Sequence, residues 1–498
     1  MSIRRQTILA SIVIYIGFAV GLLNVYFFTR EEPFTPTQYG LTGIFFAIAT
    51  MMLAFANLAM PSYIHKFYHY YNDHLPPRKN DMITWALVVS TIGFLFVIIA
   101  GWAFKNLVIR KFGENSPELL QYYYWIFPMG LGLTIFSILE AYTWHIGKPV
   151  LTNFLKEVQW RLLVTVLIVL LWVRIIPDFD LFIKLYSLTH LAIAATLFIY
   201  LIAKKKIHFT FTMSKVTRRF RKKIITLCAF VFTGSVISTL SQVFDTIVIA
   251  SLDGLDSAGV FTLASLLTSI IHAPQRGIEA ASIPHLSRAW KDKNIALIQK
   301  IYQRSSINLL IFASAIYALI ALNYTNAIAT LEINSKYLLG FNAFLLLGLT
   351  RVIDLGTGVN SQIIGTSNYW RFQLVSGVIL LSLMLPLTYV LTKNYGILGP
   401  AIANFVSITI YNLIRIIFLY RKFRLFPFTI KSMQAVILAA VAGLICYYLF
   451  RDMTGFAGLI IRSIAFIALF VTPVLMLRLS PDTTPVLESL GKRLRIRK

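Results

Sequence analysis

The chain has 498 residues, of which 57% are hydrophobic and 13% are charged, and its mean hydropathy is +0.73. So few polar side chains cannot cover the surface of a water-soluble particle of this size, which excludes a soluble protein. The net charge of +26 does not indicate a nucleic-acid partner, because in a membrane protein the position of each charge matters more than the sum.

Apolar runs long enough to cross a bilayer recur along the whole chain. A helix needs about 20 mainly apolar residues to span the hydrocarbon core, and only short polar gaps separate the runs. The pattern predicts an all-α polytopic membrane protein with about 14 transmembrane helices. In chain order the predicted helices cover residues 7–29, 39–62, 83–104, 120–143, 160–176, 180–203, 224–251, 258–283, 305–323, 337–357, 370–391, 396–420, 432–450 and 455–478.

The 46 lysines and arginines are unevenly distributed over the predicted loops. With the N-terminus inside, most fall in the termini and inner loops, and few fall in the outer loops. This bias predicts that both termini are cytoplasmic. The cluster KKKIHFTFTMSKVTRRFRKK, residues 204–223, is then an inner loop that contacts anionic lipid headgroups rather than nucleic acid.

The sequence favours a carrier over an enzyme. It has no Walker-type phosphate loop, no HExxH, no CxxC and no nucleophile elbow, and its outer connections are too short for a soluble domain. The two cysteines, Cys228 and Cys446, lie inside apolar runs and indicate neither a disulfide framework nor a metal site. We expect no enzymatic activity and no cofactor.

A weak internal repeat is visible six helices apart. Predicted helix 2 begins with YGLTGIFF and has Pro61 at its end, and helix 8 begins with AGVFTLAS and has Pro284 at its end. Helices 4 and 10 are both followed by a glycine, Gly147 and Gly365. Glycine and proline mark helix ends in any membrane protein, so this pattern alone leaves duplication as a hypothesis.

If the halves are duplicated, they are parallel copies, because an even helix offset preserves orientation. The prediction is then two pseudo-symmetric six-helix lobes around a central cavity. The predicted domains are an N-terminal lobe at 1–206, a basic inter-lobe loop at 207–223, a C-terminal lobe at 224–423, two added helices at 424–478 and a basic cytoplasmic tail at 479–498.

Two segments resemble the Wzx-type polysaccharide flippases of the MOP exporter superfamily. YGILGPAIANFVSITIYNLIRIIFLYRKF, residues 395–423, is similar to the twelfth helix of that family, and FDTIVIASLDGLDSAGVFTLAS, residues 244–265, is similar to its helix 7 to helix 8 junction. The resemblance implies that a polyprenyl-diphosphate-linked oligosaccharide moves from the inner to the outer leaflet of the bacterial inner membrane by alternating access. It also implies membrane lipids and a polysaccharide polymerase as candidate partners.

Charged residues at membrane depth are costly and usually face the interior of the bundle, which makes each one a candidate functional residue. Arg276 and Glu279 lie three residues apart in predicted helix 8, and Arg351 and Asp354 lie three apart in helix 10. Helix 4 contributes Glu140. We hypothesise that the two arginines contact the diphosphate and that the carboxylates hold them or bind a coupling proton or sodium ion. Structural ion pairs are the alternative.

Four further polar residues have two interpretations each. Asp245 is a gating or ion-site residue or an interfacial cap, near the outer end of helix 7. Asn57 and Asn404 either contact sugar hydroxyls or hydrogen-bond between helices. Arg415 lies near the basic exit of helix 12; it is either a functional residue or, as we expect, its side chain extends to the membrane surface.

Three other functions remain open from the sequence. A lipid II flippase shares the helix number and a diphosphate substrate. A MATE-type multidrug antiporter usually has twelve helices and carries cations, which fits the arginines poorly. Outside the carriers, the alternative is a structural membrane subunit of a polysaccharide export assembly.

Overall fold

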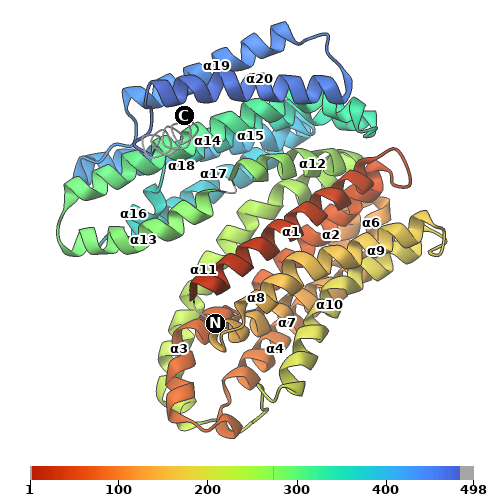
Figure 1. The fold of residues 1–498 in the computed structure, drawn as a ribbon. Coiled ribbons are helices and arrows are strands. Elements are labelled where there is room, and N and C mark those ends of the chain that lie inside the picture. Colours follow the sequence, from red (N-terminus) through yellow and green to blue (C-terminus); the bar gives the residue numbers. More distant parts are fainter. Residues whose placement is uncertain (1–2, 273, 483–498) are drawn as a thin grey trace, which may run out of the picture. The chain divides into compact units, whose positions relative to one another are not determined.

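The computed structural model describes residues 3–272 and 274–482, and within them every regular element is a helix (Figure 1). The chain divides into two compact units, Met1–Gly259 and Val260–Lys498. The predicted all-α polytopic fold is confirmed. The predicted lobe boundaries remain a prediction.

The first unit is a bundle in which the apolar helices pack in pairs. Contacts join α2 to α4, α7 and α11, and α7 to α10. Its helices are α1 (Ile3–Thr29), α2 (Pro36–Ala56), α3 (Met60–His74), α4 (Met82–Ala103), α5 (Lys105–Phe112), α6 (Pro117–Gln121), α7 (Ile126–His145), α8 (Pro149–Asn153), α9 (Trp160–Trp172), α10 (Phe179–Ala203), α11 (Lys215–Leu252) and the first residues of α12 (Gly254–His272).

The second unit contains the rest of α12 and eight further helices. Contacts join α14 to α15, α19 and α20, and α18 to α15 and α17. The helices are α13 (Gln275–Lys291), α14 (Ile295–Thr330), α15 (Phe341–Gly356), α16 (Asn360–Thr366), α17 (Arg371–Tyr395), α18 (Leu398–Phe423), α19 (Ile430–Leu449) and α20 (Gly455–Met476).

Thirteen helices in the described residues are long and apolar enough to cross a membrane. The predicted fifth helix is not among them, because α9 alone is short. However, α9 continues without interruption from α8 through a π-helix, Phe154–Gln159, so the helical path runs from residue 149 to residue 172. Two helices extend well beyond their apolar runs: α11 has 38 residues and α14 has 36.

Two predicted helices are broken where the sequence suggested continuity. Predicted helix 2 ends at Ala56 and resumes at Met60, because Leu58 and Ala59 adopt positive φ angles of 47° and 58°. The side-chain oxygen of Asn57 accepts a hydrogen bond from the Ala59 amide at 2.8 Å, which satisfies a donor freed by the break. Predicted helix 8 is likewise divided into α12 and α13.

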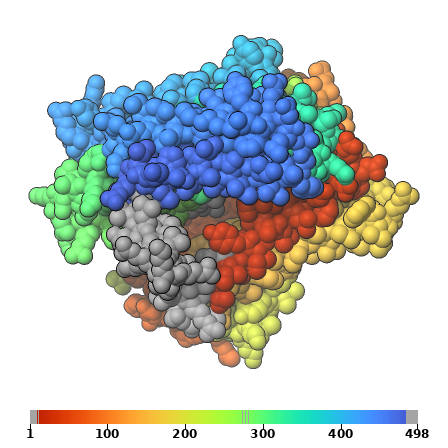
Figure 2. Space-filling model, turned by 45° about the horizontal axis from the view of Figure 1, so that its top comes forward, coloured from red at the N-terminus to blue at the C-terminus, as the bar shows by residue number. Residues whose placement is uncertain are grey.

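The last two helices pack on α14 and present an apolar outer surface. Small side chains on α19, Ala435, Ala439 and Ala442, are buried there. On the outside, large apolar side chains are exposed, including Tyr448 and Met476, and Figure 2 shows the two helices in blue on the surface. This surface suits contact with lipid.

Candidate functional site

The break between α15 and α16 places polar groups inside the second unit. The helix stops at Gly356 because Thr357 folds back, and its hydroxyl donates to the Asp354 carbonyl at 2.7 Å. Gly358 has a φ of +63°, which ordinary side chains rarely adopt. The helix resumes at Asn360. The polar residues Asp354, Thr357 and Asn360 therefore lie close together in the chain.

Asp354 is tied to α18 through Asn412. The Asn412 amide nitrogen donates to the Asp354 carboxylate at 2.8 Å. The Asn412 side-chain oxygen accepts from Asn360 at 3.0 Å, and Asn360 also donates to the Thr357 hydroxyl at 2.9 Å. The Thr357 hydroxyl also donates to the Asn412 side-chain oxygen at 3.2 Å. Together these bonds connect α15, α16 and α18, and a polar network of this type fixes a single arrangement of helices.

Arg415 lies at the edge of this network, and its side chain is only 3% exposed. Its guanidinium donates to Asn360 at 3.4 Å and to Ser376 of α17 at 3.3 Å, and it lies 4.0 Å from the centre of the Tyr411 ring. No carboxylate of a described residue forms an ion pair with it. The expectation that Arg415 extends to the membrane surface is therefore wrong: its position on α18 turns it toward α16 and α17.

Arg351, one turn before Asp354 on α15, is half-buried. Among the described residues it has neither a hydrogen-bond partner nor an ion-pair partner, and the carboxylate of Asp354 is bonded to Asn412 instead. An intramembrane arginine without an acidic partner is unusual, because its charge is costly to bury. Arg351 is thus an arginine of this site that lacks an acidic partner among the described residues.

The predicted Arg276 and Glu279 lie in the first turns of α13, just after the break that separates this helix from α12. The backbone of Arg276 is helical, but its side chain lies outside the part of the chain that the structure describes. The Glu279 carboxylate accepts a hydrogen bond from Gln275 at 2.7 Å.

Glu140 belongs to a separate cluster in the first unit. Its carboxylate lies 3.4 Å from the ammonium of Lys156, which projects from the π-helix. One residue later, Glu157 pairs with Arg161 at 2.5 Å. The π-helix widens one helical turn and so changes the direction in which these side chains project. Such segments are frequent at functional sites. Lys156 and Glu157 were not predicted as site residues because they precede the predicted fifth helix, and Arg161 was not predicted although it lies inside that helix. The charged run KEVQWR was the available signal.

The remaining predicted residues have local roles in the structure. Asn57 caps the α2 break, as described above. Asn404 is buried and donates to the Pro400 carbonyl one turn earlier at 2.9 Å. Asp245 is buried on α11, 8% exposed. None of these contacts tests the predicted roles in substrate binding or gating.

No cluster of three or more His, Cys, Asp or Glu side chains within residues 3–272 and 274–482 is arranged to hold a metal ion. The candidate site in the second unit consists of the Asp354 carboxylate, the amides and hydroxyls bonded around it, and two arginines, Arg351 and Arg415.

Comparison with known proteins identifies the family of the chain. The family described as polysaccharide biosynthesis protein matches residues 3–290. No curated protein matches the chain in sequence.

Among solved structures, the chain is similar to a lipid II flippase, MurJ, in an inward closed conformation. The identity is 16% and the TM-score 0.74, over 95% of this chain and 99% of that one. It is also similar to a multidrug resistance MATE family transporter of the MOP superfamily. For its inward-facing form the identity is 16% and the TM-score 0.63, over 84% of this chain and 99% of that one. For its outward-facing form the values are 17% and 0.55, over 84% of this chain and 95% of that one. These similarities identify the fold, and the resemblance to the MOP exporter superfamily is confirmed.

Proposed function

Because the chain belongs to the polysaccharide biosynthesis protein family, we propose that it moves a polyprenyl-diphosphate-linked oligosaccharide from the inner to the outer leaflet of the bacterial inner membrane. It is a multi-pass membrane protein with the fold of MOP exporters. Transport by alternating access needs no covalent chemistry and no cofactor. Both termini lie in the cytoplasm in this proposal, as the distribution of basic residues predicts.

Arg351 is the observation that carries the proposal. It is a half-buried arginine in an apolar helix, and no described residue neutralises it. A diphosphate supplies the missing negative charge, and the planar guanidinium presents paired donors to phosphate oxygens. Arg276 would be a second diphosphate contact, three residues from Glu279 on α13.

The carboxylates and amides have supporting roles in this proposal. Asp354 and Glu140 are the candidate coupling groups for a proton or a sodium ion, with Glu279 and Asp245 as further coupling or gating groups. Asn57 and Asn404 are candidate contacts for sugar hydroxyls. A polysaccharide polymerase would receive the flipped substrate.

The test uses liposomes that contain the purified protein and a fluorescent polyprenyl-diphosphate oligosaccharide. A membrane-impermeant quencher reports how much of the inner-leaflet lipid reaches the outside. We expect transport by the wild type and at least a tenfold slower rate for Arg351→Ala and Arg276→Ala. Arg451→Ala is the matched control, since this arginine is exposed in the loop between α19 and α20. No transport by the wild type, with or without a proton or sodium gradient, would refute the proposal.

A lipid II flippase is the second candidate, because the MurJ structure matches nearly the whole chain. Lipid II also carries a diphosphate, so the arginines do not discriminate between the two. Unlabelled lipid II, added as a competitor, does discriminate between them. Lipid II should slow transport of the labelled oligosaccharide only if the site accepts the peptide-bearing sugars of lipid II. A cation antiporter is disfavoured by an unpaired arginine, and a structural subunit would show no transport at all.

A further inference from the structure

The segment of residues 204–214, which joins α10 to α11, is held in place along its length. Tyr142 donates to the Lys206 carbonyl at 3.0 Å, the Thr210 amide donates to the Thr84 hydroxyl at 3.1 Å, and the Ser214 amide donates to Asp81 at 2.9 Å. These contacts fix the segment to α7 and to the start of α4. Its side chains therefore occupy defined positions although it has no regular structure.

Two phenylalanines of this segment remain exposed. Phe209 is 46% exposed and Phe211 is 71% exposed, on either side of the anchored Thr210. A fixed, exposed aromatic pair costs free energy in water, because apolar surface stays unburied. The pair therefore indicates an apolar neighbour other than the described residues.

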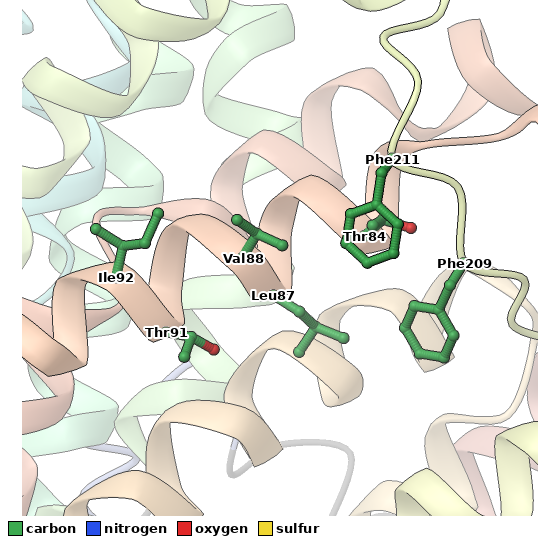
Figure 3. Close-up of a pocket in the computed structure, with 7 residues that line it drawn as sticks. All are labelled: Thr84, Leu87, Val88, Thr91, Ile92, Phe209 and Phe211. Carbon is green, nitrogen blue, oxygen red and sulfur yellow. The ribbon is translucent and has the colours of Figure 1, made fainter.

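An apolar pocket of about 260 Å³ lies between these phenylalanines and α4. Figure 3 shows Phe209 and Phe211 beside one end of α4, and the helix residues of the wall along its successive turns. The helix contributes Thr84, Leu87, Val88, Thr91 and Ile92. From Thr84 to Ile92 the helix advances about 12 Å, so the pocket extends from the start of α4 well into its membrane-spanning part.

Exposed basic side chains lie close in the chain to the residues that line this pocket. None of them forms an ion pair with a described acidic residue. One carboxylate oxygen of Asp81 accepts hydrogen bonds from Ser214 and Thr217, and its other oxygen is buried without a hydrogen-bond partner among the described residues. They are Arg78 and Lys79 before α4, Lys204, Lys205 and Lys206 at the start of the anchored segment, and Lys215, Arg218 and Arg219 at the start of α11. Their unneutralised charge makes the site complementary to an anion beside an apolar chain.

We propose that this pocket binds an anionic phospholipid of the surrounding bilayer, with one acyl chain between α4 and the two phenylalanines and the phosphate among Lys204, Lys205 and Lys206. Lipid tails are as apolar as leucine, so burial of the chain gives little preference for one lipid over another. The preference comes from the cationic cluster, which favours an anionic headgroup over a zwitterionic one. The site lies entirely within the first unit and does not depend on the proposed transport function.

Native mass spectrometry of the full-length protein in detergent tests the site. The probes are phosphatidylglycerol and phosphatidylcholine with the same acyl chains. We expect phosphatidylglycerol to bind the wild type about tenfold more tightly than phosphatidylcholine, an advantage of the size that a few surface lysines supply. Lys204→Gln/Lys205→Gln/Lys206→Gln should abolish this preference.

The apolar part of the site is tested by filling it. Val88→Trp should weaken binding of both lipids, and Ile92→Trp serves the same purpose if that variant does not fold. Ile99→Trp is the matched control, because Ile99 is 59% exposed on α4 but does not line the pocket. Lys291→Gln/Lys293→Gln/Lys300→Gln, which removes three exposed lysines elsewhere, controls for total charge.

Three outcomes would overturn the proposal. The first is equal binding of the two phospholipids by the wild type. The second is an equal loss of binding in the lysine variant and its charge control, which would show attraction by net charge alone. The third is that a polyprenyl diphosphate displaces bound phosphatidylglycerol at a lower concentration than free phosphatidylglycerol does. This result would assign the pocket to the transported lipid.

Discussion

Gly40 of α2 and Gly259 of α12 pack against each other reciprocally. A Cβ atom on Gly40 would lie 2.9 Å from the Gly259 nitrogen, and a Cβ atom on Gly259 would lie 3.1 Å from the Gly40 nitrogen. Each would also meet a backbone carbonyl of the opposite helix, that of Leu255 or of Pro36. These glycines begin the two helices that the sequence repeat pairs.

Replacing either glycine by alanine should destabilise the protein. The obstructing atoms belong to the backbone and cannot rotate away, so the helices must separate, which typically costs about 1–3 kcal/mol. The melting temperature of the purified protein in detergent should fall for Gly40→Ala and Gly259→Ala.

Gly443→Ala on α19 is the control, since a Cβ atom there has no neighbour within 4 Å. It should leave the melting temperature unchanged or raise it slightly, because alanine favours a helix by about 0.5–1 kcal/mol over glycine. Equal effects at all three positions would show that the α2–α12 contact is not tight.

The helical architecture was predictable because apolar runs of membrane length are a direct consequence of the bilayer thickness. The interruptions were not. The break after Asn57 depends on two residues with positive φ, Leu58 and Ala59, whose side chains give no indication of it. The π-helix that carries Lys156 is equally invisible in a hydropathy pattern.

The sequence predicted several residues of the candidate site but not the contacts between them. Arg351 and Asp354 were selected by their depth, yet the partner of Asp354 is Asn412, on a helix nearly sixty residues later. Arg415 was misinterpreted because its sequence position near a basic exit says nothing about helix rotation. Contacts of this kind depend on which faces of three helices meet, and a single sequence does not specify that.

Arg415 should be sensitive to a change that keeps its charge. Lysine cannot reach Asn360 and Ser376 together, so Arg415→Lys leaves a buried acceptor without its donor, at about 1–3 kcal/mol. Thermal unfolding should show the loss. Arg451→Lys is the control, because Arg451 is exposed. If both substitutions leave the melting temperature unchanged, the hydrogen bonds of Arg415 contribute nothing to stability.

Substitution of Asp354 should change transport without changing stability. Asp354→Asn retains an oxygen that accepts from Asn412, so the network and the melting temperature should change little. The charge is lost, however, and with it any binding of a coupling ion. In the liposome assay we expect the variant to lose the acceleration produced by a proton or sodium gradient. Asn412→Leu provides the contrast: it removes the donor and should lower the melting temperature. A fully gradient-dependent Asp354→Asn variant would exclude Asp354 as the coupling group.

Lys156 and Glu140 should be thermodynamically coupled across the π-helix and α7. The side chain of Glu140 is 13% exposed and that of Lys156 is 54% exposed. Among the described residues, Lys156 is the only cation within ion-pair distance of the Glu140 carboxylate. Lys156→Met leaves this charge unneutralised, and Glu140→Gln removes the charge itself. We expect Lys156→Met to destabilise the wild type clearly more than it destabilises the Glu140→Gln variant, by about 0.5–1 kcal/mol, a low value because Lys156 is solvent-exposed. Denaturation of the wild type, both single variants and the double variant measures this difference. Additive effects would show that the 3.4 Å contact is a solvated pair without energetic weight, and the π-helix would then need another explanation.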